Sequence, residues 1–142
     1  MAIRETLTTF LERHRVAHLA TCDASGRPHV VPICYTIDEG TLYSVIDRKP
    51  KRRPPGQLRR VRNLLMNPRV AAVVDTYSED WSQLWYVLVE GTARVIEDGP
   101  EHSAALRLLQ RKYPQYRGMT LDDRPVIAIA IERTVTWGRL SP

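Results

Sequence analysis

The sequence predicts a mainly β fold, a small barrel of six mostly antiparallel strands with helices appended to it. Apolar and polar residues alternate in several short runs, as expected for half-buried strands. Short turns rich in Gly, Pro and Asp join consecutive runs, which favours antiparallel pairing. The regular strand–helix alternation of a parallel sheet is absent. Because 142 residues is the size of one domain, residues 1–142 are expected to form a single unit.

The first third of the chain begins with a helix and continues as a meander of strands. Apolar residues at helical spacing predict a helix over Ala2–His14. The turn Asp23–Pro28, in which Gly26 can take a positive φ, and the tight turn Asp38–Gly40 then separate three strands. These strands are expected at Val16–Cys22, His29–Ile37 and Thr41–Ile46.

The rest of the chain supplies two more helices and three more strands. Leu58, Val61, Leu64 and Leu65 form an apolar stripe that predicts a short helix. Asn67-Pro68 ends it, because a residue before proline avoids helical geometry. The later elements are expected as a helix at Glu101–Lys112, an irregular connection at Tyr113–Arg124, and strands at Val70–Tyr77, Trp81–Ile96 and Pro125–Trp137.

Positive charge is concentrated in one segment, Arg48–Arg69. It holds nine of the 21 Lys and Arg residues, and no Asp or Glu occurs between Asp47 and Asp75. The other residues carry 12 basic and all 16 acidic side chains, a net charge of −4, so the overall +5 is a local feature. One compact cationic site predicts a polyanionic partner, such as the phosphates of a cofactor or of a nucleic acid.

Several classes of site and location are disfavoured by the sequence. It contains no G-x-S-x-G, G-x-G-x-x-G or phosphate-binding P-loop motif, and no Cys/His spacing typical of a metal site. Cys22 and Cys34 lie in strand-like runs and are expected to be reduced, buried thiols of a cytoplasmic protein. No apolar run is long enough for a membrane span or a signal peptide. With no catalytic constellation, any chemistry is expected to come from a bound cofactor.

The order of the motifs resembles a known family. The run V-A-H-L-A-T-C-D-A-S-G-R-P-H-V-V-P-I-C-Y is followed by a hairpin, a basic loop, R-R-V-R-N-L-L-M-N-P-R-V, and later W-Y-V-L-V-E-G-T-A-R-V-I. Together these resemble the pyridoxamine 5′-phosphate oxidase-like family of split β-barrels of the FMN-binding type. The segment D-W-S-x-L-W at Asp80–Trp85 resembles the branch that uses coenzyme F-420, a deazaflavin.

The resemblance implies an oxidoreductase that transfers a hydride between coenzyme F-420, or alternatively FMN, and a small organic acceptor. It also implies a homodimer with two cofactor sites at the subunit interface. The ring of the cofactor would lie against Val31, Pro32, Ile33, Tyr43, Ser44 and Val45. The phosphate would be bound by Lys49, Lys51, Arg60 and Arg62, with Arg59 and Asn63 in support. No side chain is assigned as an obligatory acid or base, although Tyr35, Tyr43 and Ser44 would lie within reach of the ring.

Two other function classes remain open from the sequence. The basic segment permits nucleic-acid binding, but residues 44–76 contain no aromatic residue, whereas single-strand binders place aromatics among basic residues. A haem-binding split barrel would need an axial ligand, and none of the four histidines is an obvious one. Trp81 and Trp85 would share one face of a strand, where packing in the core or a dimer is the expected role.

Overall fold

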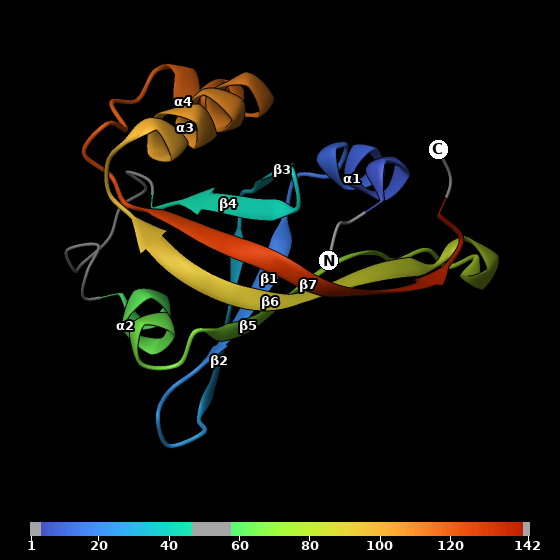
Figure 1. Cartoon of the computed structure of the whole chain (residues 1–142). Helices are drawn as coiled ribbons and strands as arrows, with labels where there is room; N and C mark the ends of the chain where they lie inside the picture. The colour runs from blue at the N-terminus through green and yellow to red at the C-terminus, as the bar shows by residue number, and fades with distance from the viewer. Residues whose placement is uncertain (1–3, 47–57, 141–142) are drawn as a thin grey trace.

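A computed structural model describes residues 4–46 and 58–140, which fold around one antiparallel sheet (Figure 1). The helices are α1 (Glu5–Glu12), α2 (Arg59–Met66), α3 (Pro100–Lys112) and α4 (Pro114–Arg117), with a 3-10 turn at Trp81–Gln83. The strands are β1 (Ala17–Cys22), β2 (Pro28–Ile33), β3 (Thr36–Asp38), β4 (Thr41–Val45), β5 (Arg69–Thr76), β6 (Trp85–Ile96) and β7 (Val126–Gly138).

The strands pair in the order β2-β1-β5-β6-β7-β4-β3, and every pairing is antiparallel. The two strands at the ends of this order, β2 and β3, are consecutive in the chain and are separated only by Cys34 and Tyr35. The sheet therefore curls until its two edges meet at one corner of the chain, without a ladder between them. The mainly β antiparallel fold with peripheral helices is confirmed, and the expected number of six strands is wrong, because the described residues form seven.

The additional strand arises from a break inside the segment expected to be one strand, His29–Ile37. Tyr35 is fully buried at the break, and its backbone N–H donates to the Tyr113 hydroxyl at 3.0 Å. The Tyr35 hydroxyl donates to the carbonyl oxygen of Leu11. Since the backbone of Tyr35 bonds to a side chain instead of a neighbouring strand, the chain turns there and begins β3 at the far edge of the sheet.

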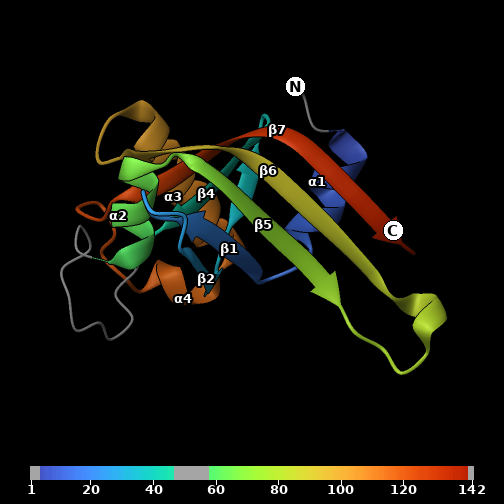
Figure 2. The same cartoon turned by 90° about the horizontal axis from the view of Figure 1, so that it is seen from below.

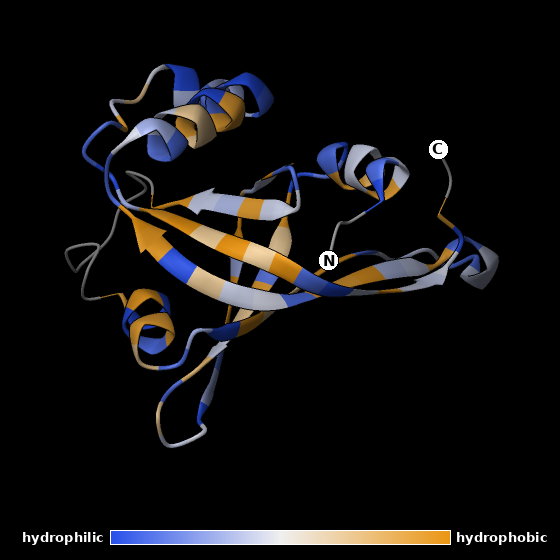
Figure 3. Cartoon of the chain, in the orientation of Figure 1, coloured by the Kyte–Doolittle hydropathy of each residue, from blue (hydrophilic) through white to orange (hydrophobic). Residues whose placement is uncertain are grey.

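The core has two parts. The main part fills the inside of the curled sheet and includes Leu19, Leu42 and Val87, with α1 and α2 covering its openings. The second part lies between the outer side of β4 and β7 and the pair α3–α4, where Leu109 and Val126 are buried. In Figure 3 the first half of β7 is apolar, and Val126–Ile129 are buried there, because both faces of the sheet are covered at this place.

The β5–β6 connection extends as an arm beyond the rest of the molecule (Figure 2). It contains a short turn in which the Asp80 carboxylate accepts the backbone N–H of Ser82 at 3.1 Å. Because this turn places Trp81–Gln83 in a 3-10 conformation, the strand expected from Trp81 starts only at Trp85. The expectation that Trp81 and Trp85 share a face is wrong: Trp81 is 71% exposed, whereas Trp85 is buried against Phe10.

Candidate functional site

Helix α2 is held on the sheet by one apolar face and one buried hydrogen bond. Val61 and Leu64 enter the main core, whereas Leu65, expected on the same stripe, is 65% exposed. Asn63 is buried beside them, and its side-chain nitrogen donates to the Thr21 hydroxyl of β1 at 3.1 Å. A buried amide needs such a partner, so this bond fixes the rotation of α2 about its axis. The arginines on the other side of the helix, Arg59 and Arg62, are consequently exposed.

The turn between β1 and β2 faces this exposed side of α2. The Asp23 carboxylate accepts the backbone N–H groups of Ser25 at 2.8 Å and Arg27 at 2.9 Å. It also pairs with Arg27 Nε at 3.1 Å. The backbone N–H of Arg27 is the main cause that lowers the pKa of Asp23, so this carboxylate stays charged at neutral pH. Gly26 adopts φ +84°, which an L side chain would strain.

A groove of about 760 Å³ separates the turn from the helix. Its lining consists of Asp23, Ala24, Ser25, Arg27, Arg59, Arg62, Asn63 and Met66. The structure thus brings Arg62, expected to bind the phosphate, together with Arg59 and Asn63, which were expected to support it. It adds Arg27, which the sequence analysis missed. The turn itself is visible in the sequence, but its position opposite α2 follows only from the pairing of β1 with β2 and the docking of α2.

Arg60 and His29 form a second feature beside the groove. His29 belongs to β2, and burial lowers its pKa, with the positive charges of Arg59 and Arg60 adding to the effect. The ring is therefore neutral at neutral pH. Its Nδ1 is buried, and no hydrogen-bond partner for it is recorded in the described part of the chain. His29 is another residue that the sequence analysis did not assign to the site.

Strand β2 continues from the groove as an edge strand. A proline has no N–H, so in this antiparallel pair Pro28 and Pro32 occupy positions whose backbone groups point away from β1. Val30 lies between them, and its backbone N–H and carbonyl groups also point away from β1, because alternate residues of a strand direct these groups to the same side. The outer edge of β2 therefore offers three carbonyl oxygens and a single N–H. Of the residues expected near a cofactor ring, Val31 and Ile33 face the core and Pro32 lies on this edge.

The other residues expected near the ring lie elsewhere in the single chain. Tyr43 and Val45 are buried in the second core beneath α3. The Tyr43 hydroxyl donates to Glu101 at 2.7 Å, and burial, with this bond, raises the pKa of Tyr43 to about 12. Ser44 is buried and pairs with Ile127 in β7. Lys49 and Lys51 lie outside the described residues.

Among residues 4–46 and 58–140, no cluster of three or more His, Cys, Asp or Glu side chains could hold a metal ion. In the same ranges, no helix combines the length and apolar character needed to cross a membrane.

An antiparallel sheet curled into a split barrel, with an arginine-lined groove at one end, defines a class of small ligand-binding barrels. The family model described as pyridoxamine 5′-phosphate oxidase matches residues 3–138 of this sequence. The chain therefore belongs to the pyridoxamine 5′-phosphate oxidase family of oxidoreductases.

Individual proteins show the same relationship. A 5a,11a-dehydrotetracycline/5a,11a-dehydrooxytetracycline reductase of Streptomyces rimosus is 32% identical over 133 residues, covering 92% of this chain and 79% of the relative. A haem-binding protein of Mycobacterium smegmatis superposes with a TM-score of 0.72 at 19% identity, covering 96% of this chain and 55% of that one. A FAD-binding protein of Mesorhizobium loti superposes with a TM-score of 0.67 at 23% identity, covering 96% and 95%. The last two are similar in fold.

Proposed function

We propose that the protein transfers a hydride between coenzyme F-420 and a small organic acceptor, with FMN as the alternative cofactor. The observation that carries this proposal is the groove in which Arg59 and Arg62 of α2 face the turn that leads into β2. Arginine binds phosphate through a planar fork of N–H groups, and such charge-assisted bonds are about twice as strong as neutral ones. Within the described residues no ion pair is recorded for Arg59 or Arg62, so both can serve a ligand.

The phosphate end of the cofactor fits these residues. Arg59 and Arg62 would bind it, with Arg60 and Lys49 or Lys51 as further ligands from the same segment. Asn63 would support the site indirectly, because its bond to Thr21 holds α2 in place.

The ring would lie along the outer edge of β2. The carbonyl oxygens of Pro28, Val30 and Pro32 can accept N–H groups of a ring, and Val30 N–H can donate to a ring carbonyl. The cofactor itself supplies the hydride, and the chain binds and orients it. In this proposal Tyr43 and Val45 support the fold beneath α3 and do not touch the ring.

A second copy of the chain would complete the site. Large apolar side chains are exposed on the outer face of the sheet: Val30 is 59% exposed, and Tyr86 and Trp137 stack on each other at 5.8 Å and remain open to solvent. Burying this face against its copy would remove apolar surface from water and cover the edge of β2. A sedimentation measurement that finds a monomer at micromolar concentration with cofactor tightly bound would refute the dimer.

The nature of the acceptor is suggested by the curated relative, which is named as a reductase of dehydrotetracyclines. We propose conjugated or carbonyl-bearing compounds as the acceptor class. Haem binding is less well supported, because three of the four histidines contact other residues of the chain and are poorly placed to serve as an axial ligand. His14 packs between Phe10 and Trp85, and His102 Nε2 lies 2.7 Å from the Arg124 carbonyl oxygen. His29 lies beside the arginines, which leaves His18 on the outer face.

Titration with F-420, FMN and haem, followed by absorbance, tests the proposal directly. We expect F-420 or FMN to bind more tightly than about 100 μM and the protein to accelerate reoxidation of the reduced cofactor by a dehydrotetracycline or another enone. If neither cofactor binds with a dissociation constant below about 100 μM, which is about 5.5 kcal/mol of affinity, the proposed oxidoreductase function is refuted. Binding of single-stranded nucleic acid by the same sample would then favour the nucleic-acid alternative.

A further inference from the structure

The groove is larger than one phosphate group requires. Its volume of about 760 Å³ is in the upper part of the range for small-molecule sites, roughly 300–1,000 Å³. The two arginines of α2 line only one wall. The opposite wall is the β1–β2 turn, which contributes its own arginine, Arg27, from a different element of the fold.

Arg27 is held in a defined orientation although 75% of its side chain is exposed. Asp23 accepts its backbone N–H and also pairs with Nε, so one carboxylate fixes both ends of the residue. This pairing occupies Nε and leaves the two terminal nitrogens of the guanidinium, for which no acceptor is recorded among the described residues. A guanidinium oriented through Nε can present its terminal nitrogens to an anion.

The lining of the groove also includes apolar side chains. Ala24 of the turn and Met66 of α2 are the apolar residues of the lining, and Met66 is 71% exposed. Methionine adapts its shape to irregular ligands, so it can contact a short uncharged linker. The groove thus combines arginines from two elements of the fold with apolar lining residues.

From this arrangement we propose that the groove binds a ligand with two anionic groups, the second of which is bound by Arg27. The first is the phosphate bound by Arg59 and Arg62, so the inference rests on the proposed function for that half of the groove. The second is a phosphate or a carboxylate, joined to the first by a short linker that packs on Met66. Arg27 therefore selects cofactors that carry an anionic extension over those with a single phosphate.

Binding of orthophosphate and pyrophosphate, measured by isothermal titration calorimetry, tests this without any cofactor. We expect the native protein to prefer pyrophosphate and Arg27→Gln to lose about tenfold of that preference, with orthophosphate affinity changed less than twofold. Arg62→Gln should weaken both ligands. Arg107→Gln, at an exposed arginine of α3, serves as the matched control and should change neither. Equal effects of Arg27→Gln on both ligands, or none on either, would overturn the proposal.

The same variants show whether the second anionic group is a phosphate or a carboxylate. They also test the second anion site separately from the proposed function. FAD should bind more tightly than FMN, and Arg27→Gln should abolish the difference. Preference for malonate over acetate with the same Arg27 dependence would identify a carboxylate as the second group. If FMN and F-420 both fail to bind while the pyrophosphate preference depends on Arg27, the proposed function fails and the second anion site stands. If FMN or F-420 binds and the protein does not prefer pyrophosphate, the proposed function stands and the second anion site is refuted.

Discussion

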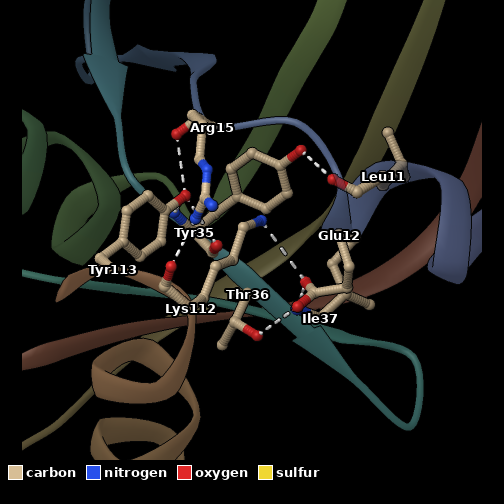
Figure 4. Close-up of polar contacts among 8 residues, drawn as sticks. All are labelled: Leu11, Glu12, Arg15, Tyr35, Thr36, Ile37, Lys112 and Tyr113. Carbon is tan, nitrogen blue, oxygen red and sulfur yellow. Dashed lines mark hydrogen bonds and ion pairs between the residues drawn. The ribbon is translucent and has the colours of Figure 1, made fainter.

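Lys112 Nζ lies 3.8 Å from the centre of the Tyr35 ring, at the corner where β2 gives way to β3 (Figure 4). The lysine side chain is only 6% exposed, and its ion-pair partner, Glu12, is 3.7 Å away. The Tyr113 ring is also close, and Arg15 donates to the Lys112 carbonyl oxygen. The side chain of Lys112 therefore lies where α1, α3 and the corner between the two edge strands meet.

The first prediction concerns the pH dependence of stability. Burial lowers the pKa of Lys112 from 10.5 to about 8, although the carboxylate of Glu12 acts in the opposite direction. Between these two pH values the unfolded chain binds the proton and the folded chain does not, so the free energy of unfolding rises with pH in this window. We expect a gain of up to about 2 kcal/mol between pH 8 and 10, measured by urea denaturation.

Two further titrations and a pair of variants define that window. The pKa values of Tyr35 and Tyr113 are raised by burial, so the unfolded chain loses these protons first and stability falls again above about pH 10. Lys112→Met should remove the rise between pH 8 and 10, because the apolar stem remains and the charge does not. Arg111→Met, at the exposed neighbouring position, should keep it. An unchanged pH profile in Lys112→Met would show that another group titrates.

The second prediction concerns the close approach of β6 and β7. At Gly91 the register between these strands shifts, and an added Cβ would lie 2.1 Å from the Ala130 carbonyl oxygen. Backbone cannot move aside as a flexible side chain would, so Gly91→Ala should destabilise the protein by about 3 kcal/mol. Gly118→Ala is the control, because its Cβ would meet no atom within 4 Å. Similar thermal unfolding curves for the two variants would contradict this close contact.

The third prediction concerns the bond that positions α2. Asn63→Ala leaves the buried Thr21 hydroxyl without its partner and should cost about 1–3 kcal/mol of stability. Thr21→Val should cost a similar amount, and the double variant should cost less than the sum, because neither group is then left unsatisfied. Additive losses in this cycle, measured by chemical denaturation, would show that the two side chains act independently.

The alternation of apolar residues and the turn motifs predict most of the fold, whereas the extra strand and the site depend on contacts distant in sequence. The pattern from His29 to Ile37 is continuous, and only Tyr113, 78 residues away, supplies the hydroxyl that breaks it. Likewise, α2 and its arginines are predictable from helical spacing. Arg27 and His29 join them only because β2 pairs with β1 beside that helix. The position of Tyr43 beneath α3 follows from which face of β4 that helix covers.

The fourth prediction tests the role of Tyr43. Tyr43→Phe removes the hydroxyl that donates to Glu101, while Arg94 keeps its own ion pair with that carboxylate at 2.6 Å. We expect a loss of about 0.5–1.5 kcal/mol in stability and a change in cofactor affinity below twofold. A tenfold loss of cofactor affinity in a stably folded Tyr43→Phe protein would restore Tyr43 as a neighbour of the ring.

The last prediction separates the cations that could bind the cofactor phosphate. Each charged hydrogen bond contributes roughly 1.5–3 kcal/mol, so Arg62→Ala should weaken F-420 or FMN binding about tenfold or more. Arg60→Ala should have an effect of the same size if its guanidinium also reaches the phosphate, and Arg107→Ala on α3 should have none. Fluorescence titration of the cofactor measures each affinity, and circular dichroism verifies that each variant is folded. Unchanged affinity in both Arg60→Ala and Arg62→Ala would refute the phosphate site on α2, and a loss confined to Lys51→Ala would move the phosphate to the segment before this helix.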